Sequence, residues 1–411
     1  MPQINACRFC KNPKLNRYLD LGATPLADRF LSAEQLNEPE KYYPLAVALC
    51  ENCGLSQLTY TVDPKELYQE EYPYAMSLTK TGSDHYGSFA ASVVKKFNLT
   101  QNDLVIDVGS NVGILLEGFK KNGTKTLGVD PAANMAKIAN ERGIETIADF
   151  FVPSVATGIK EKYGPAKIVV GTNVFAHIFD HHQFIEALQA VLDEKGIFIF
   201  ESPSFVNLVK NLEYDTIYHE HLLYLSLKPV ANFFKQFDME VFDVESYPIH
   251  GGSFRVFISR KNNYPINESV EKYLKEEEAT GIYSLPTLGE FAKKVAQNRI
   301  ELMNLIHKIK EEGKTIAIIS TPAKGMTLLN YCRIGPEHAD FATEKSPLKI
   351  GRYTPGTRIP IVPDSELMVR KPDYAILLAW NFSNEIMKNL DEYRALGGKF
   401  IIPIPKPEIK G

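Results

Sequence analysis

Short apolar runs alternate with helix-like segments through the middle of the chain. The first run, residues 104–108, ends at Gly109 and leads into a spacing of apolar positions over 114–119 that is typical of a helix. A helical pattern covers 184–188, and further strand-like runs lie at residues 126–129, 167–170, 196–200, 239–244 and 254–259. This alternation predicts a doubly wound, Rossmann-like α/β domain, which we assign to residues 71–262.

The distal part of the chain shows a second pattern of the same kind. From residue 263 the sequence turns to long helical stretches, notably 291–311, and then to a buried-strand pattern at 315–320. Further apolar runs at 374–380 and 399–404 flank another helical stretch. We therefore expect residues 263–411 to form a C-terminal Rossmann-like α/β domain.

The turn between the predicted strand and helix at 321–325 carries a cation, Lys324. A lysine at the N-terminus of a helix is able to receive an anionic diphosphate. An ordinary surface lysine is the alternative interpretation.

Four of the five cysteines form two Cys-x-x-Cys pairs: Cys7 with Cys10, and Cys50 with Cys53. Two such knuckles present four thiolates tetrahedrally, which is the closed geometry of a structural zinc site. No histidine or carboxylate replaces a thiolate, and a reducing cytosol disfavours disulfides. We expect a small zinc-binding domain over residues 1–70, with four unconnected thiols as the alternative.

The glycine turn after the first apolar run predicts a nucleoside site. Gly109 and Gly113 allow the backbone to approach a ligand closely, and Asp130, about twenty residues later, can accept hydrogen bonds from ribose hydroxyls. The turn lacks the full Gly-x-Gly-x-x-Gly pattern that seats a pyrophosphate. A turn with acidic neighbours, Asp107 and Glu117, favours the sulfonium of S-adenosylmethionine over NAD. A strand-turn-helix that binds no ligand is the alternative.

Two more segments are expected near this ligand. Asp149 could reach the exocyclic amine of an adenine, and Phe150 could cover the base, although an ordinary core aromatic is an equal alternative. Asn173 and His177 follow the strand-like run at 167–170, at the edge where open sheets bind ligands. A structural histidine is the other interpretation of His177.

A candidate acid/base site lies in the sequence Tyr218-His219-Glu220-His221. Histidine titrates near neutrality, glutamate can orient an imidazole, and tyrosine can hydrogen-bond an oxyanion, so this set is equipped to take a proton from carbon. The two-residue spacing of the histidines argues against a shared zinc ion. A polar loop with packed aromatics is the alternative.

The amino-acid composition and net charge of the chain limit the kinds of partner that we expect. The chain has 411 residues, 44% of them hydrophobic, which is enough for two to four domains. A net charge of −4 gives no sign of the broad basic face that nucleic acids need. There is no apolar run of about 18 residues and no leader at Met1-Pro2-Gln3, so we expect a cytoplasmic protein without a membrane span.

These motifs together resemble the sugar C-methyltransferases of deoxysugar biosynthesis, over nearly the whole chain. The matching segments are the cysteine pairs, 24–27, 72–74, 109–111, 173–177, 218–221, 321–325, 330–332 and 353–361. The resemblance implies methylation by S-adenosylmethionine of carbon 3 in a nucleotide-linked, usually TDP-linked, 4-keto-6-deoxy sugar, beside a zinc-binding domain.

The resemblance also assigns roles to residues. His221 is implied as the base, Glu220 as the group that tunes it, and Tyr72, Tyr218 or His177 as partners of the ketone oxygen. The cofactor contacts expected are Asp107, Gly109, Ser110, Asn111, Gly113, Asp130, Asp149, Phe150 and Asn173. The substrate contacts expected are Tyr74, Lys324, Asn330 and Arg358.

One residue departs from the family pattern. The family turn commonly reads Gly-Ser-Asn-Asp-Gly, whereas Val112 stands at the acidic position here. The alternatives to C-methylation are an O- or N-methyltransferase of a nucleotide sugar, and a noncatalytic protein that binds sugar nucleotides or a partner enzyme. The sugar, its carrier, the stereochemistry and the oligomeric state stay open, and a monomer is plausible.

Overall fold

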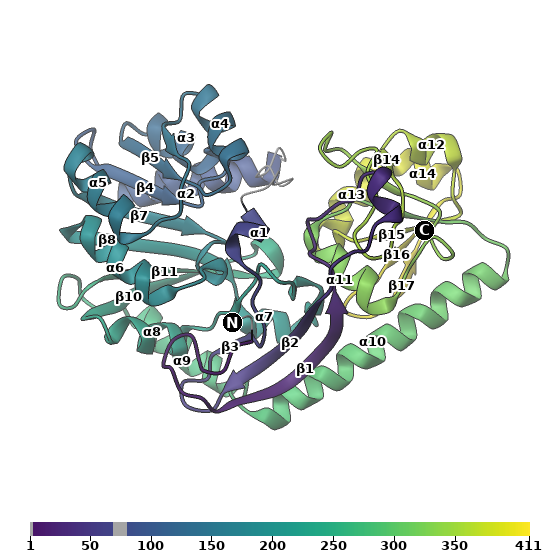
Figure 1. The fold of residues 1–411 in the computed structure, drawn as a ribbon, viewed down its shortest axis with the longest axis horizontal. Helices are drawn as coiled ribbons and strands as arrows, with labels where there is room; N and C mark the ends of the chain where they lie inside the picture. Colours follow the sequence, from purple (N-terminus) through teal and green to yellow (C-terminus); the bar gives the residue numbers. More distant parts are fainter. Residues whose placement is uncertain (1–2, 69–79) are drawn as a thin grey trace.

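The computed structural model describes residues 3–68 and 80–411, which form three β-sheets with their covering helices (Figure 1). The sheets have four, seven and six strands. The expected fold class is confirmed, with a small N-terminal domain, a central doubly wound α/β domain and a C-terminal α/β domain.

The four-stranded sheet joins the N-terminal segment to a distant part of the chain. Its antiparallel order is β1-β2-β3-β9, from β1 (Leu15–Thr24), β2 (Tyr43–Cys50), β3 (Ser56–Leu58) and β9 (Leu223–Tyr224). In this sheet Ser56 pairs with Tyr224 and Gln57 with Leu223. The strand that follows Tyr218–His221 directly is therefore an edge strand of the cysteine-bearing domain.

The seven-stranded sheet has the order β10-β11-β8-β7-β4-β5-β6, and β11 is its antiparallel strand. Successive residues such as Val105 and Ile106 pack in different apolar clusters, because side chains alternate across a strand and helices cover both faces. The strands are β4 (Leu104–Val108), β5 (Lys125–Val129), β6 (Thr146–Ile147), β7 (Ala166–Thr172), β8 (Leu192–Pro203), β10 (Met239–Tyr247) and β11 (Ser253–Arg260).

Helices lie between these strands in the chain order that a doubly wound sheet requires. They are α2 (Lys80–Phe97), α3 (Ile114–Lys121), α4 (Ala133–Glu141), α5 (Pro153–Tyr163), α6 (His181–Val191), α7 (Phe205–Lys210) and α8 (Leu227–Lys235). A short helix, α1 (Pro64–Tyr68), precedes them.

The six-stranded sheet belongs to the C-terminal domain and is parallel except for its last strand. Its order is β14-β13-β12-β15-β16-β17, from β12 (Ile316–Ile319), β13 (Ala342–Glu344), β14 (Ile361–Pro363), β15 (Tyr374–Leu377), β16 (Lys399–Ile402) and β17 (Glu408–Lys410). Its helices are α11 (Ala323–Cys332), α12 (Glu366–Arg370), α13 (Ser383–Asn389) and α14 (Asp391–Ala395).

The N-terminal segment lies between the two α/β domains (Figure 1). Leu31 and Tyr353 exchange both backbone hydrogen bonds, with N···O distances of 3.0 and 2.9 Å. The long helix α10 (Leu285–Glu311) contacts both β1 and α11. Helix α9 (Glu268–Ala279) packs against β10, and Glu277 accepts the amide hydrogen of Leu227 at 2.7 Å.

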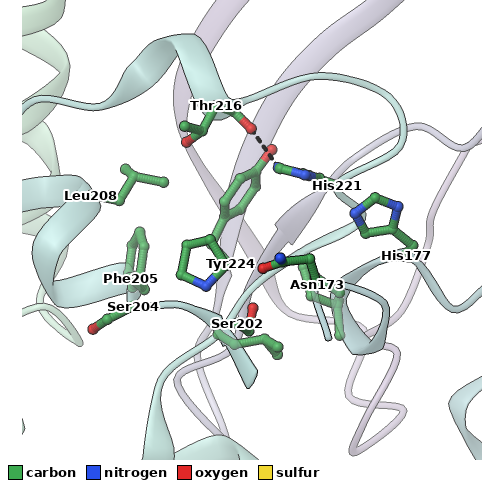
Figure 2. A pocket seen from close by; sticks show the side chains of 13 residues that line it. Asn173, His177, Ser202, Ser204, Phe205, Leu208, Thr216, His221 and Tyr224 are labelled. Atoms are coloured by element: carbon green, nitrogen blue, oxygen red, sulfur yellow. Dashed lines mark hydrogen bonds between the residues drawn. The ribbon is translucent and has the colours of Figure 1, made fainter. Parts of the chain in front are cut away.

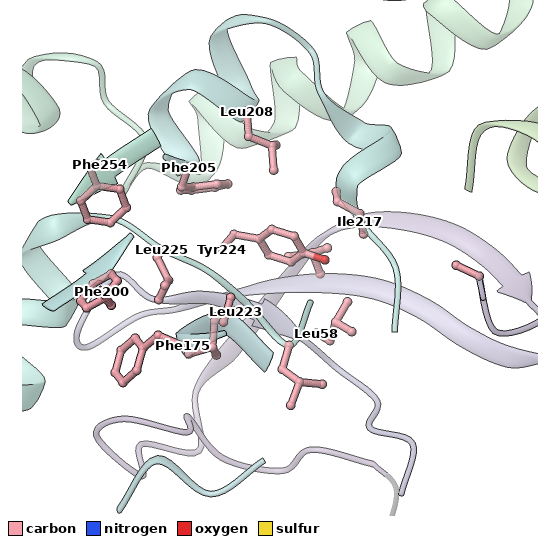
Figure 3. Close-up of a cluster of buried hydrophobic side chains, with 14 of the residues drawn as sticks. Leu58, Phe175, Phe200, Phe205, Leu208, Ile217, Leu223, Tyr224, Leu225 and Phe254 are labelled. Atoms are coloured by element: carbon pink, nitrogen blue, oxygen red, sulfur yellow. The ribbon is translucent and has the colours of Figure 1, made fainter. Parts of the chain in front are cut away.

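A buried apolar cluster fixes β9 in place (Figure 3). Leu58 of β3, Leu223 of β9 and Phe200 of β8 belong to the same core. Burying each such side chain stabilises the fold by roughly 1.5–3 kcal/mol. The segment that carries His221 is therefore held by the cores of two domains.

In residues 3–68 and 80–411, no helix combines the length and apolar character that a membrane crossing requires.

Candidate active site

The four predicted cysteine ligands come together at one end of the N-terminal sheet. Their sulfur atoms all lie within 4.8 Å of one another, and the pairs Cys7–Cys53 and Cys10–Cys50 are each 3.5 Å apart. Thiolates around a tetrahedral zinc at about 2.3 Å are separated by roughly 3.8 Å. The cluster therefore fits a structural zinc ion that all four cysteines hold.

The zinc knuckle packs on the central domain. The ring of Phe9, between two of the cysteines, stacks on Phe233 of α8 with centroids 4.1 Å apart. Arg8 donates to the carbonyl oxygen of Phe179 at 2.6 Å and to the hydroxyl of Thr61 at 2.6 Å. The metal site therefore supports the interface that positions β9.

The glycine turn has the backbone that a bound nucleoside needs. Gly109 has φ of 70°, and a Cβ there would lie 2.3 Å from a methyl carbon of Val174, so no other residue fits. The carboxylate of Asp130 accepts the backbone hydrogens of Asn111 at 2.7 Å and Ala132 at 2.8 Å. These bonds fix Asp130 at the carboxyl end of β5, where ribose hydroxyls bind in this class of sheet.

Buried polar atoms at the ends of β4 and β7 lack partners among the described residues: Asp107 Oδ1, Ser110 Oγ, Thr172 Oγ1 and Asn173 Oδ1. Burial, and then the nearby Asp130, raises the pKa of Asp107 well above its usual range. Because buried polar atoms normally have partners, this set fits a polar ligand such as the methionine end of S-adenosylmethionine.

The other expected cofactor residues have varied surroundings. Asp149 is exposed and accepts the amide hydrogen of Phe150 at 2.7 Å, while Phe150 is half-buried. Val112, which departs from the family pattern, packs with Ala132 and Met135 in a small apolar cluster. The adenine contacts stay predictions.

Glu117, the second acidic neighbour named for the sulfonium, pairs instead with Lys121 at 2.8 Å and Arg142 at 2.7 Å. These ion pairs lie on the surface of α3. The carboxylate of Glu117 thus forms ion pairs with neighbouring side chains.

Two histidines predicted from separate segments meet at the carboxyl edge of the sheet. The ring centroids of His177 and His221 are 4.7 Å apart (Figure 2). The ring centroid of Tyr218 lies 4.0 Å from that of His221. His177 follows β7, while His221 precedes β9. The structure therefore brings three of the five expected catalytic residues into contact.

The hydrogen bond of His221 fixes its tautomer. Nδ1 lies 2.7 Å from the carbonyl oxygen of Thr216, which has no hydrogen to donate. Nδ1 must therefore carry the hydrogen, and in the neutral ring Nε2 is the proton acceptor. This arrangement suits a general base.

His177 has a partner that the sequence did not indicate. The hydroxyl oxygen of Tyr68, at the end of α1, lies 3.2 Å from its Nδ1. Burial, together with the neighbouring His221, lowers the pKa of His177 well below its usual range, so the ring is neutral. Nothing in the helical pattern around Tyr68 marks it as a site residue. The one feature of the sequence that could have indicated it is its nearness to the 72–74 motif.

His219 has a structural place. Its side chain is 1% exposed, and Nε2 lies 3.3 Å from the carbonyl oxygen of Pro44 in β2. Burial lowers its pKa to about 4. Residues 218–221 form a turn, in which the amide of His221 donates to the carbonyl oxygen of Tyr218 at 3.0 Å. The turn places His219 against the N-terminal sheet and His221 beside His177.

The carboxyl group of Glu220 contacts Asp28 of the N-terminal segment. Burial raises the pKa of Asp28, although the charge of Lys349 and a hydrogen bond with Glu220 each act to lower it. The ammonium group of Lys349 donates to the carbonyl oxygen of Thr321 at 2.8 Å. Asp28 therefore interacts with both Glu220 and Lys349 of the C-terminal domain. Asp28 had no signal in the sequence beyond its place after the 24–27 motif.

A cavity of about 30 Å³ lies beside the two histidines. Tyr224, 4% exposed, lines it, and its hydroxyl has no hydrogen-bond partner in the described chain (Figure 2). Such a cavity holds one water molecule. The remaining lining residues include Asn173, Ser202, Ser204 and Thr216.

The expected substrate contacts are scattered. Lys324 lies 3.9 Å from Asp215 and over the ring of Trp380. Asn330 donates to the carbonyl oxygens of Met326 and Pro355, and Arg358 donates to that of Leu36. Tyr72 and Tyr74 lie outside the described residues. Substrate roles for these positions stay predictions.

Known protein families match all three parts of the chain. A zinc-binding domain matches residues 7–68, a methyltransferase domain 84–244, and a C-methyltransferase C-terminal domain 248–405. The C-methyltransferase NovU of Streptomyces niveus is 36% identical over 407 residues, which cover 99% of this chain and 97% of NovU.

Solved methyltransferase structures resemble part of the chain. Magnesium protoporphyrin IX methyltransferase (ChlM) of Synechocystis PCC 6803, with bound SAM, gives 15% identity and a TM-score of 0.33, covering 44% of this chain and 79% of its own. A SAM-dependent methyltransferase of Anabaena variabilis ATCC 29413 gives 15% identity and a TM-score of 0.33, covering 47% of this chain and 100% of its own. The 36% identity with NovU over nearly the full length of both chains confirms the expected family. This chain belongs to the S-adenosylmethionine-dependent C-methyltransferases with an N-terminal zinc-binding domain.

Proposed function

We propose that the enzyme methylates carbon 3 of a nucleotide-linked 4-keto-6-deoxy sugar, with TDP as the expected carrier. The observation that carries the proposal is the pairing of His221, whose Nδ1 is committed to Thr216, with the neutral His177 at 4.7 Å between ring centroids. One ring can accept a proton from carbon while a second polar ring lies beside it. A sugar with a ketone next to the reacting carbon uses both.

The chemistry follows from the acidity of a carbon next to a ketone. Nε2 of His221 takes the proton from carbon 3, and the electron pair of that C–H bond moves to the ketone oxygen as an enolate. Bound S-adenosylmethionine would supply an electrophilic methyl group: the enolate electron pair would return to carbon 3 and form the new bond to the methyl carbon, the ketone would be restored, and the sulfur would leave as a neutral thioether. Each hydrogen-bond donor at the enolate oxygen contributes about 2.7–4 kcal/mol in comparable sites.

We assign the nucleotide to the face of the C-terminal domain that meets the catalytic segment. Lys324 lies in the first turn of α11 and 3.9 Å from Asp215, five residues before Glu220. The N-terminus of a helix with a lysine suits a diphosphate. Tyr72 and Tyr218 are proposed as further partners of the sugar, and Tyr74, Asn330 and Arg358 as further substrate contacts.

The test is mass spectrometry and NMR of products from TDP- and GDP-linked 4-keto-6-deoxy sugars, with matched non-keto sugars as controls. A methyl carbon bonded to carbon 3 of the keto sugars alone is the expected result. A methyl group on carbon 5, the other carbon next to the ketone, would keep the enolate chemistry and correct the position. Methylation of the non-keto controls would overturn the proposal.

A further inference from the structure

The two histidines of the site have different hydrogen-bond partners at the same ring nitrogen. Nδ1 of His221 faces a carbonyl oxygen, that of Thr216, at 2.7 Å. Nδ1 of His177 faces a hydroxyl group, that of Tyr68, at 3.2 Å. A carbonyl oxygen only accepts a hydrogen bond, whereas a phenol hydroxyl can also donate one.

We propose that Tyr68 is a positioning residue that fixes His177 in the tautomer opposite to that of His221. The phenol of Tyr68 donates to Nδ1 of His177, so the ring hydrogen of His177 is on Nε2. His221 then offers a proton acceptor at Nε2, and His177 offers a proton donor at the same ring position. This inference rests on the proposed reaction through an enolate.

The protonation states of all three groups agree with this arrangement. Burial, and then the charges of Glu220, Asp28 and Asp130, raises the pKa of Tyr68 well above its usual range, so its hydroxyl keeps its hydrogen. Burial and His221 keep His177 neutral. A neutral imidazole has one donor nitrogen and one acceptor nitrogen, so its partner at Nδ1 decides which nitrogen faces the substrate.

The geometry places the free nitrogen of His177 at the site. Figure 2 shows one ring nitrogen of His177 turned toward His221 and the other turned away. Tyr68, which contacts Nδ1, is not among the residues that line the cavity beside His221, so the nitrogen on that side is Nε2. A ketone and its neighbouring C–H present an acceptor and a proton side by side, which matches a donor and an acceptor on adjacent rings.

The consequence is a division of labour between the histidines. His221 removes the proton from carbon, and His177 donates a hydrogen bond to the oxygen on which negative charge develops. Had both rings the same tautomer, the site would hold two bases and leave the oxygen to other donors. Tyr68 therefore acts on the reaction through the ring of His177.

The first test is NMR of the full-length protein labelled with ¹⁵N in its histidine rings. The signals of His177 and His221 are assigned by their loss in His177→Asn and His221→Asn. Hydrogen on Nε2 of His177 and on Nδ1 of His221 is the expected result. Hydrogen on Nδ1 of His177 would overturn the proposal, and this measurement needs no substrate, so it is independent of the proposed sugar.

The second test compares Tyr68→Phe with Tyr43→Phe. The hydroxyl of Tyr43 bonds Glu66 of the same helix α1 at 2.6 Å and does not touch His177, so it controls for the position of the helix. Tyr68→Phe should lower kcat by about tenfold or more with KM little changed and should mix the His177 tautomers, because one donor to the oxyanion is weakened. Unchanged kcat and unchanged His177 signals in Tyr68→Phe, or an equal loss in Tyr43→Phe, would contradict the role of Tyr68.

Discussion

The Nδ1 atom of His221 lies 2.7 Å from the carbonyl oxygen of Thr216, five residues earlier in the chain. The last residue of η3 (Tyr214–Thr216) thus holds the ring of His221, which precedes β9, through its Nδ1 atom. The contact is local, but its direction depends on β9, which is paired with β3 of the N-terminal domain.

His221→Gln is therefore expected to lower kcat by a factor of about 10² to 10⁴, the range that a general base contributes. Binding of S-adenosylmethionine, measured by calorimetry, should be unchanged. His219→Gln is the matched control, since His219 is buried against Pro44 and its replacement should reduce stability by roughly 1–3 kcal/mol with less effect on kcat. Full turnover in His221→Gln would remove the assignment of the base.

The local features of the site could be predicted from the sequence. Gly109, Asp130 and the cysteine pairs each depend on spacing within a short stretch, so a pattern is enough to predict them. The place of His177 also followed from a general rule, because open parallel sheets bind ligands at the carboxyl ends of their strands and His177 follows β7.

Contacts between distant segments escaped prediction. Tyr68 and Asp28 reach the site from the N-terminal domain, and Tyr224 turns its hydroxyl into the cavity because β9 pairs with β3. None of these residues belongs to a motif, since each depends on how two domains pack. A single sequence has no spacing that reports such packing.

Zinc is expected to support both stability and turnover. Metal analysis of the wild type should find about one zinc per chain, and Cys50→Ser should lose it because one of four thiolates is missing. The melting temperature should fall first, and kcat should follow as the pairing of β3 with β9 weakens. Cys332→Ser is the control, since this buried thiol lies in α11 and its loss should leave the zinc content unchanged. A zinc-free wild type with full stability would contradict the site.

Binding of S-adenosylmethionine is expected to depend on Asp130. Its carboxylate is held by the amides of Asn111 and Ala132, so it presents its remaining lone pairs in a fixed direction. A hydrogen bond to a charged group contributes about 1.5–3 kcal/mol, so Asp130→Ala should raise Kd roughly tenfold to a hundredfold by calorimetry. Glu117→Gln, on α3, should leave Kd unchanged because Glu117 pairs with Lys121 and Arg142. Equal effects of the two changes would reject Asp130 as a specific contact.

Acid stability is expected to depend on a buried ion pair between β8 and β11. Two nitrogens of Arg255, Nη2 at 2.7 Å and Nε at 3.1 Å, donate to one oxygen of Glu201, and Nε2 of His85 lies 2.6 Å from the other. Burial alone would raise the pKa of Glu201, but the contacts with His85 and Arg255 lower it. A carboxyl group whose pKa is lower in the folded state stabilises the fold above its unfolded pKa, and that stability is lost as the pH falls through the folded value.

Chemical unfolding of the wild type should therefore show a free energy of unfolding that declines below about pH 4, the ordinary range of a glutamate. Arg255→Met leaves Glu201 charged and buried without its main partner, so it should cost about 3–5 kcal/mol at neutral pH. The double change Arg255→Met with Glu201→Leu removes both charges and should recover a large part of that loss. If the double variant were as unstable as Arg255→Met, the packing of Arg255 between the rings of Phe89 and Tyr247 would outweigh its charge.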